Sequence, residues 1–254
     1  MYANYKNCLN TSMRDIRIYQ NCELSLNTTV QLDVQAARHI AQVLRMPEGA
    51  EIILFNGTGN DYLARIVSIS KKETMVHIHD RFYKDTESSL RVHLFQGLSK
   101  GDRMDTAIQK SVELGANYIT PMLCEHTVVR TSSDRNDKKQ AHWMNIIINA
   151  CEQSGRSLIP ELFPTTGFNL ALSSLESSQT LLLHPDSPYS ISNVPIDNGK
   201  INLMIGPEGG FSENEISRAE TEGVKLVSIG KRILRTETAP VAALSVLQAR
   251  FGDY

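Results

Sequence analysis

Residues 201–215, with the sequence INLMIGPEGGFSENE, contain three structural signals in a row. Residues 201–205 are a short apolar run that is typical of a buried strand. Three glycines and a proline follow in residues 206–210, and Ser212 then stands three residues before Glu215, the spacing of a capping box that opens a helix. A glycine loop between a strand and a helix lets the backbone approach a ligand closely. The stretch therefore predicts a ligand-binding loop in an α/β domain.

Strands and helices alternate on both sides of this stretch, from residue 90 to the end of the chain. This alternation predicts an α/β domain with a mostly parallel sheet, which binds ligands beyond the carboxyl ends of its strands. Residues 172–178 and 186–199 have the composition of surface loops. Apolar runs predict strands at 92–98, 118–123, 181–183, 201–205 and 225–229, and periodicity predicts helices at 102–114, 141–153, 213–222 and 241–250.

The first third of the chain differs, because it contains mostly short strand signals. Residues 62–69 and 74–79 predict a hairpin, and one helix with Ala37, Ile40 and Leu44 on its apolar face follows a plausible cap at Asp33. We expect a small β-barrel with one helix at 13–85, a polar extension at 1–12, and the α/β domain at 90–254.

Composition excludes several classes of protein. The 254 residues are 41% hydrophobic and 21% charged, with a net charge of −2, which argues against disorder, coiled coil and a uniformly basic nucleic-acid binder. We expect no membrane span and no signal peptide, hence a cytoplasmic protein. The four cysteines are far apart, and His77 and His79 lack a third ligand, so neither a disulfide framework nor a metal site is expected.

Two further loops could carry chemistry. Residues 229–240 form a loop after a predicted strand and contain three charged residues, Arg232, Arg235 and Glu237. Thr238 could cap the helix that follows. Residues 149–156 end a helix at a glycine, with Arg156 just beyond it, although a helix cap alone would explain this segment. In the first loop, Glu208 argues against a phosphate ligand, because a carboxylate repels an anion.

Four arginines of the first domain form a modest basic set. They are either a solvated face or a grip on RNA phosphates that carries no sequence information. The four are Arg14, Arg17, Arg38 and Arg45.

Taken together, the glycine loop, the sequence RILRTETAP at 232–240 and the sequence EQSGR at 152–156 resemble the ribosomal RNA small subunit methyltransferase E family. The resemblance continues through GDRMD at 101–105 and HIAQVLRM at 39–46, and it covers essentially residues 13–251. The family's usual Glu-Arg-Ser is here Glu125-His126-Thr127.

This resemblance implies methylation of uridine N3 in 16S rRNA of the small ribosomal subunit, with S-adenosylmethionine as cofactor. It also implies a SPOUT-type parallel sheet with a C-terminal deep trefoil knot, a PUA-like barrel that binds RNA, and a homodimer. Arg235 and then Arg156 become the candidates for stabilising charge on the uracil oxygens. Glu237 is the nearest base, although it could equally be held in an ion pair with Arg232 or Arg235. The implied cofactor site comprises Leu183, His184, Pro185, Ile205, Gly206, Pro207, Glu208, Gly209, Gly210, Ile229, Gly230, Ile233, Leu234, Thr236 and Thr238.

Other functions stay open from the residues alone. The same fold could methylate another RNA, such as tRNA, or the chain could be a non-catalytic RNA-binding protein of ribosome assembly. An enzyme acting on nucleotide phosphates is disfavoured by Glu208 and by the lack of a Lys-Ser/Thr pair after the glycines.

Overall fold

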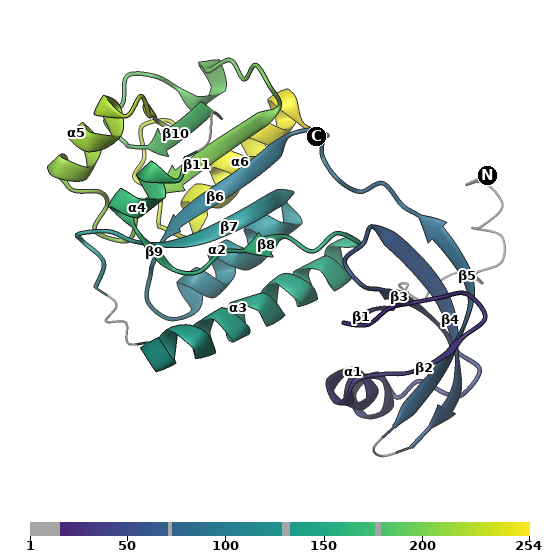
Figure 1. The fold of residues 1–254 in the computed structure, drawn as a ribbon. Helices are drawn as coiled ribbons and strands as arrows, with labels where there is room; N and C mark the ends of the chain where they lie inside the picture. The colour runs from purple at the N-terminus through teal and green to yellow at the C-terminus, as the bar shows by residue number, and fades with distance from the viewer. Residues whose placement is uncertain (1–15, 71–72, 129–132, 176–178) are drawn as a thin grey trace. The chain divides into compact units, whose positions relative to one another are not determined.

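The computed structural model describes residues 16–70, 73–128, 133–175 and 179–254. The predicted extension at 1–12 and Arg14 lie outside the described residues. The chain forms two compact units (Figure 1). Among the described residues, those up to Thr86 together with Gly155–Leu158 form the first, and the others, from Glu87 onward, form the second.

The first unit is built on a five-stranded sheet with the order β1-β3-β4-β5-β2. Its strands are β1 (Arg17–Tyr19), β2 (Thr29–Gln31), β3 (Glu51–Phe55), β4 (Asn60–Ile69) and β5 (Thr74–Tyr83). Strands β4 and β5 form the predicted antiparallel hairpin, and β1 pairs with β3 in parallel. The two edge strands meet at one end, where the Gln20 side chain donates to the Asp33 carboxylate at 2.9 Å and accepts from the Asp33 backbone N–H at 3.0 Å.

The predicted helix of this unit begins where expected. Asp33 caps α1 (Val34–Arg38) by accepting from the Ala36 backbone N–H at 2.9 Å. The chain continues as the π-helix η2 (His39–Leu44), and its apolar side is buried through Ile40. Arg38 and Arg45 are exposed on the other side, so a role in RNA binding stays a prediction for both.

Arg17 does not belong to an exposed basic face, and the prediction that it contacts RNA is wrong. Its side chain is only 5% exposed and forms an ion pair with the fully buried Asp61. The guanidinium also donates to the Ser157 hydroxyl at 3.0 Å and to the Arg156 carbonyl at 3.3 Å. This arginine therefore holds segment 155–158 against the sheet of the first unit.

The second unit contains a seven-stranded sheet in which every pairing between strands is parallel. The order is β12-β10-β11-β6-β7-β8, and β9 also pairs with β7. The strands are β6 (Arg91–Gly97), β7 (Ala116–Leu123), β8 (Glu161–Leu162), β9 (Thr166–Gly167), β10 (Gln179–Leu183), β11 (Lys200–Ile205) and β12 (Lys225–Val227).

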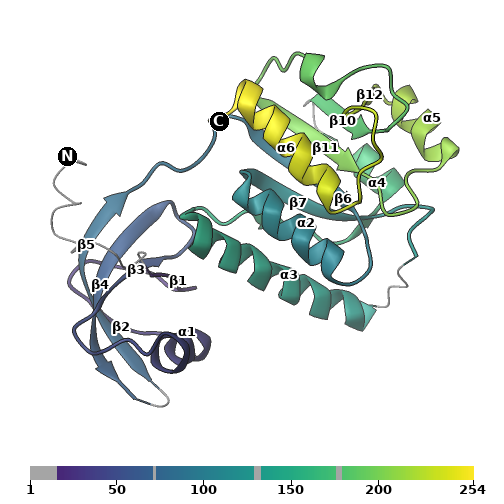
Figure 2. The same ribbon diagram turned by 180° about the vertical axis from the view of Figure 1, so that it is seen from behind.

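Helices cover both faces of this sheet. The helices α2 (Asp102–Glu113), α3 (Ser133–Ser154) and α6 (Thr238–Phe251) lie on one face (Figure 2). The shorter α4 (Phe168–Ser173) and α5 (Glu213–Thr221) lie on the other (Figure 1). Alternate strand residues supply the two cores, so that Leu94 and Leu203 pack towards α6, whereas Phe95 and Met204 pack towards α4 and α5.

These findings confirm the parallel α/β sheet, while the knotted path of the chain stays a prediction. The assignment of residues 186–199 to a surface loop is wrong in part. Ile191 and Val194 are buried in the core beside α6, and Ile191 opens the short 3-10 helix η3 (Ile191–Asn193). Leu172 is likewise buried, as part of α4 rather than of a loop.

Replacing Arg17 by methionine should lower the free energy of unfolding by about 3–5 kcal/mol, because Asp61 is then left as an uncompensated buried charge. Urea denaturation followed by circular dichroism measures this. The double variant Arg17→Met/Asp61→Leu should recover most of the loss, since it removes both charges. The exposed Arg38→Met is the matched control, and an equal loss in that variant would contradict the assignment.

Candidate functional site

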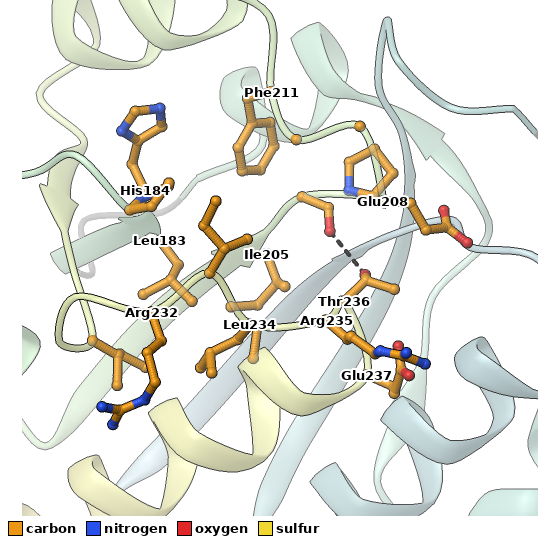
Figure 3. Close-up of a pocket in the computed structure, with 18 of the residues that line it drawn as sticks. Leu183, His184, Ile205, Glu208, Phe211, Arg232, Leu234, Arg235, Thr236 and Glu237 are labelled. Carbon is orange, nitrogen blue, oxygen red and sulfur yellow. Dashed lines mark hydrogen bonds between the residues drawn. The ribbon is translucent and has the colours of Figure 1, made fainter.

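Three neighbouring strands end at the same edge of the large sheet and send their loops into one place. The strands β12, β10 and β11 are adjacent and parallel, so the residues that follow Val227, Leu183 and Ile205 converge. Between these loops lies a pocket of about 660 Å³ (Figure 3). Its apolar wall includes Leu183, Ile205 and Leu234.

Thr236 fastens the loop after β12 to the loop after β11. Its hydroxyl donates to the Gly206 carbonyl at 2.9 Å, the bond dashed in Figure 3. The same hydroxyl accepts from the Gln96 side chain at 3.2 Å, and Gln96 is fully buried near the end of β6. The pocket wall is thus attached to the centre of the sheet.

Behind the glycine loop, the backbone of β6 packs so closely that it requires a further glycine, Gly97. A Cβ on Gly97 would stand 2.4 Å from the Pro207 nitrogen and 2.6 Å from the Gly206 carbonyl carbon. No side chain fits there, so Gly97 lets the end of β6 lie directly against the loop. Gly210 closes the loop with φ of +70°, and its N–H donates to the Pro207 carbonyl at 2.9 Å.

Glu208 points to the start of α2. Its carboxylate accepts from the Lys100 backbone N–H and from the Arg103 guanidinium, each at 3.0 Å. Burial alone would raise the pKa of Glu208, but these hydrogen bonds, together with one from its own backbone and the positive charge of Arg103, lower that pKa. The carboxylate therefore stays ionised at neutral pH and has its own partners within the protein.

Arg235 and Glu237 line the pocket but do not pair with each other. The structure forms no ion pair between Glu237 and either Arg232 or Arg235 in the described part of the chain. The Glu237 Oε2 atom is buried and has no hydrogen-bond partner there. Arg232 lies well apart from both residues in Figure 3.

His126 contacts the glycine loop from the segment after β7. Its Nδ1 atom lies 3.0 Å from the Gly209 carbonyl oxygen, and a Cβ on Gly209 would stand 2.7 Å from the His126 Cβ. The Glu125-His126-Thr127 segment therefore braces the loop.

Most of the predicted site residues surround this one pocket, and their binding roles stay predictions. Thr238 does not line it and does not cap α6 with its side chain; it is the first residue of the helix, after Glu237. Arg156 is buried in the first unit and does not line the pocket. Arg103 and Phe211 also line the pocket and were not predicted to do so, although GDRMD at 101–105 is a signal for Arg103. The predicted residues that line the pocket are Leu183, His184, Pro185, Ile205, Gly206, Pro207, Glu208, Gly209, Gly210, Ile229, Gly230, Ile233, Leu234, Arg235, Thr236 and Glu237.

The part of the chain that the structure describes contains no group of three or more His, Cys, Asp or Glu side chains arranged to hold a metal ion. Among its helices, none combines the length and apolarity needed to cross a membrane.

Comparison with known proteins identifies the family. Residues 86–248 match a family described as "RNA methyltransferase domain", and residues 32–74 match "RNA methyltransferase PUA domain". The ribosomal RNA small subunit methyltransferase E of Buchnera aphidicola (Schizaphis graminum) is 36% identical over 93% of this chain and 97% of its own length. The chain belongs to the ribosomal RNA small subunit methyltransferase E family. The enzyme of the same name from Bacillus subtilis is 30% identical over 86% of this chain and 89% of its own length.

Solved structures of family members have the same fold. A methyltransferase from Legionella pneumophila, described in complex with the bound cofactor SAM, is 41% identical with a TM-score of 0.93, covering 95% of this chain and 100% of its own. The Neisseria gonorrhoeae methyltransferase E bound to S-adenosylmethionine is 38% identical with a TM-score of 0.89 and the same coverage. The family assignment made from the sequence motifs is confirmed.

Alanine at Gly97 should reduce the free energy of unfolding by about 1–3 kcal/mol, because the new methyl group overpacks against the backbone of Gly206 and Pro207. Gly167→Ala is the matched control, since a Cβ there has no neighbour within 4 Å. Chemical denaturation of both variants measures the difference. Equal stabilities would show that the loop shifts freely.

Proposed function

We propose that this chain transfers a methyl group from S-adenosylmethionine to N3 of a specific uridine in the 16S rRNA of the small ribosomal subunit. The observation that carries the proposal is the pocket at the ends of β10, β11 and β12, in a chain aligned over 95% of its length with family structures that hold the cofactor. A ribosomal substrate also supports a location in the cytoplasm.

The pocket residues fit this cofactor chemically. The apolar wall of Leu183, Ile205 and Leu234 suits a flat purine, and the glycine loop offers backbone groups at close range. When bound, the cofactor supplies an electrophilic methyl group on a sulfonium. Because Glu208 is already satisfied by Arg103 and Lys100, it does not confront the ligand with an unpaired carboxylate.

Arg235 and Glu237 suit the proton chemistry of uridine. Loss of the N3 proton spreads negative charge over O2 and O4, and a guanidinium aimed at those oxygens lowers the cost. Arg235 is exposed at the pocket and forms no ion pair with a described residue, so it can turn towards a base. The unpartnered Oε2 of Glu237 is an acceptor for the N3 proton. Arg156 is less suited to this role, because it is buried in the first unit and does not line the pocket.

A second copy of the chain is part of the proposal. The family resemblance implies a homodimer, and Ile233, which is 86% exposed on the loop that lines the pocket, is a residue that we expect the second copy to cover. Sedimentation at several protein concentrations measures the oligomeric state.

The decisive experiment is nucleoside mass spectrometry of small-subunit rRNA from cells with and without this protein. We expect N3-methyluridine to disappear on deletion and to return with the unaltered gene. Loss of the methyl group from tRNA instead would favour the same fold with another substrate. If no methylated nucleoside changes and S-adenosylhomocysteine gives no heat in calorimetry, the chain is a non-catalytic ribosome-assembly protein.

Arg235→Ala should lower kcat by roughly 10²–10³, by analogy with removal of one oxyanion donor, because the interaction strengthens in the transition state. The KM for RNA and the affinity for S-adenosylhomocysteine should change little. Arg235→Lys should recover part of the rate, since an ammonium lacks the planar fork. Higher pH should partly rescue the alanine variant, because more N3 is then deprotonated.

Lys231→Ala is the control for Arg235, because it removes an exposed cation from the same loop without touching the pocket lining. Methyl transfer to rRNA under steady-state conditions measures both variants. A loss confined to RNA affinity would make Arg235 a binding residue instead.

A further inference from the structure

The large sheet carries a second pocket, of about 580 Å³, at the amino-terminal ends of its central strands. Arg91 and Lys200 are the first residues of β6 and β11, whereas the first pocket lies beyond Ile205, at the other end of β11. Side chains alternate along β6, so that Val92 packs towards α6, whereas Arg91 and His93 lie on the same strand face as Phe95, which packs towards α4.

The floor of this pocket is a cluster of aromatic rings that the fold holds in place. His93 stacks on Phe95 with ring centres 4.1 Å apart and on Phe163 with centres 5.2 Å apart. Tyr118 lies 5.6 Å from His93 and 6.2 Å from Phe163. The His93 Nε2 atom lies 2.7 Å from the Thr120 hydroxyl. Tyr118 and Phe163 are half-buried, so their rings are partly accessible from the pocket.

His93 contributes a neutral ring to the cluster. Burial lowers its pKa to about 4, because the imidazolium would lose its hydration there. At neutral pH the positive charge of the pocket therefore comes from the rim alone.

That rim is basic. Arg91 and Lys200 stand opposite each other on paired strands, both are exposed, and neither forms an ion pair with a described residue. None of the described residues that line the pocket is acidic. The buried Thr166 hydroxyl in the lining has no hydrogen-bond partner in the described part of the chain. The pocket thus combines flat rings, an unused polar group and two free cations.

We infer that this pocket binds one unstacked nucleotide of the RNA substrate, with its base against Tyr118 and Phe163 and its phosphate between Arg91 and Lys200. Single-stranded nucleic acid is bound in this way elsewhere, by aromatic rings that take a base of any sequence and cations that follow the backbone. Because the rim carries two positive charges and none of its described residues is acidic, it favours a polyanion such as RNA over a second copy of this chain, whose net charge is only −2. The inference rests on the proposed function, because it concerns the same RNA.

Two variants of the full chain separate the two contacts. Arg91→Ala/Lys200→Ala should weaken binding of a small-subunit rRNA transcript and reduce the logarithmic salt slope by about 0.7 for each lost single-strand phosphate contact. Tyr118→Leu keeps an apolar side chain but removes stacking, and should weaken binding by about tenfold with the salt slope unchanged. Filter binding at several salt concentrations measures both quantities.

Arg218→Ala/Lys225→Ala is the charge-matched control, since both residues are exposed in the same unit and lie outside the pocket lining. S-adenosylhomocysteine affinity should be the same in all variants, which shows that they are folded. A transcript carrying 5-iodouridine should also crosslink to Tyr118 or Phe163, as mapped by mass spectrometry.

The outcomes distinguish this inference from the function on which it rests. If the unaltered protein binds the transcript but transfers no methyl group, the proposed function is wrong. The binding measurements on the variants still test the pocket in that case. Wild-type affinity and salt slope in every pocket variant of an active enzyme would overturn the pocket alone. A shift of the variants to a smaller species with RNA affinity intact would show that a second copy covers this face, and would also overturn it.

Discussion

The hydrogen bond from Thr236 to the Gly206 carbonyl joins two loops that lie 30 residues apart in the sequence. Each loop alone is a surface turn after a short strand. Joined, and held from behind by the Gln96 side chain, they form one wall whose position is fixed by the buried end of β6. Gly97 completes this arrangement, because only a residue without a side chain lets Pro207 lie so near the sheet. These contacts within the protein hold the pocket wall in place, which reduces the ordering that a ligand must impose on the two loops.

The part of this arrangement that sequence reasoning could predict follows from one rule. Short apolar runs that alternate with helices imply parallel strands, and the loops after such strands share an edge. This rule located the loops around Gly206 and Arg235. It does not give the order of the strands: β10 lies between β11 and β12, and the two loops meet through the Thr236–Gly206 hydrogen bond. The contact between Arg103 and Glu208 could not be predicted for the same reason, because it depends on where α2 begins relative to β11.

Whether a residue in a charged or polar stretch is buried was the hardest property to predict from the sequence. Arg17 has the same local sequence character as an exposed arginine, and only Asp61, 44 residues away, makes its burial tolerable. The polar composition of residues 186–199 similarly concealed Ile191 and Val194, which pack in the core beside α6. Periodicity detects an apolar face only over several turns of regular structure, and these two residues belong to a 3-10 helix of three residues and the position that follows it. In both cases a distant partner decides burial, and local sequence does not contain it.

The two pockets of the large sheet lie at opposite ends of β11 and are built by different means. At the carboxyl end, loops converge and their backbone forms the walls, as expected for parallel strands. At the amino end, strand side chains form the floor, because α4 has only six residues and begins at Phe168. It covers Phe95 in the core but leaves Arg91 exposed and His93 half-buried on the same strand face. A longer helix would have buried this region and required apolar residues there. The short helix instead leaves aromatic rings and cations at the surface, where their retention costs the fold little and where a ligand can reach them.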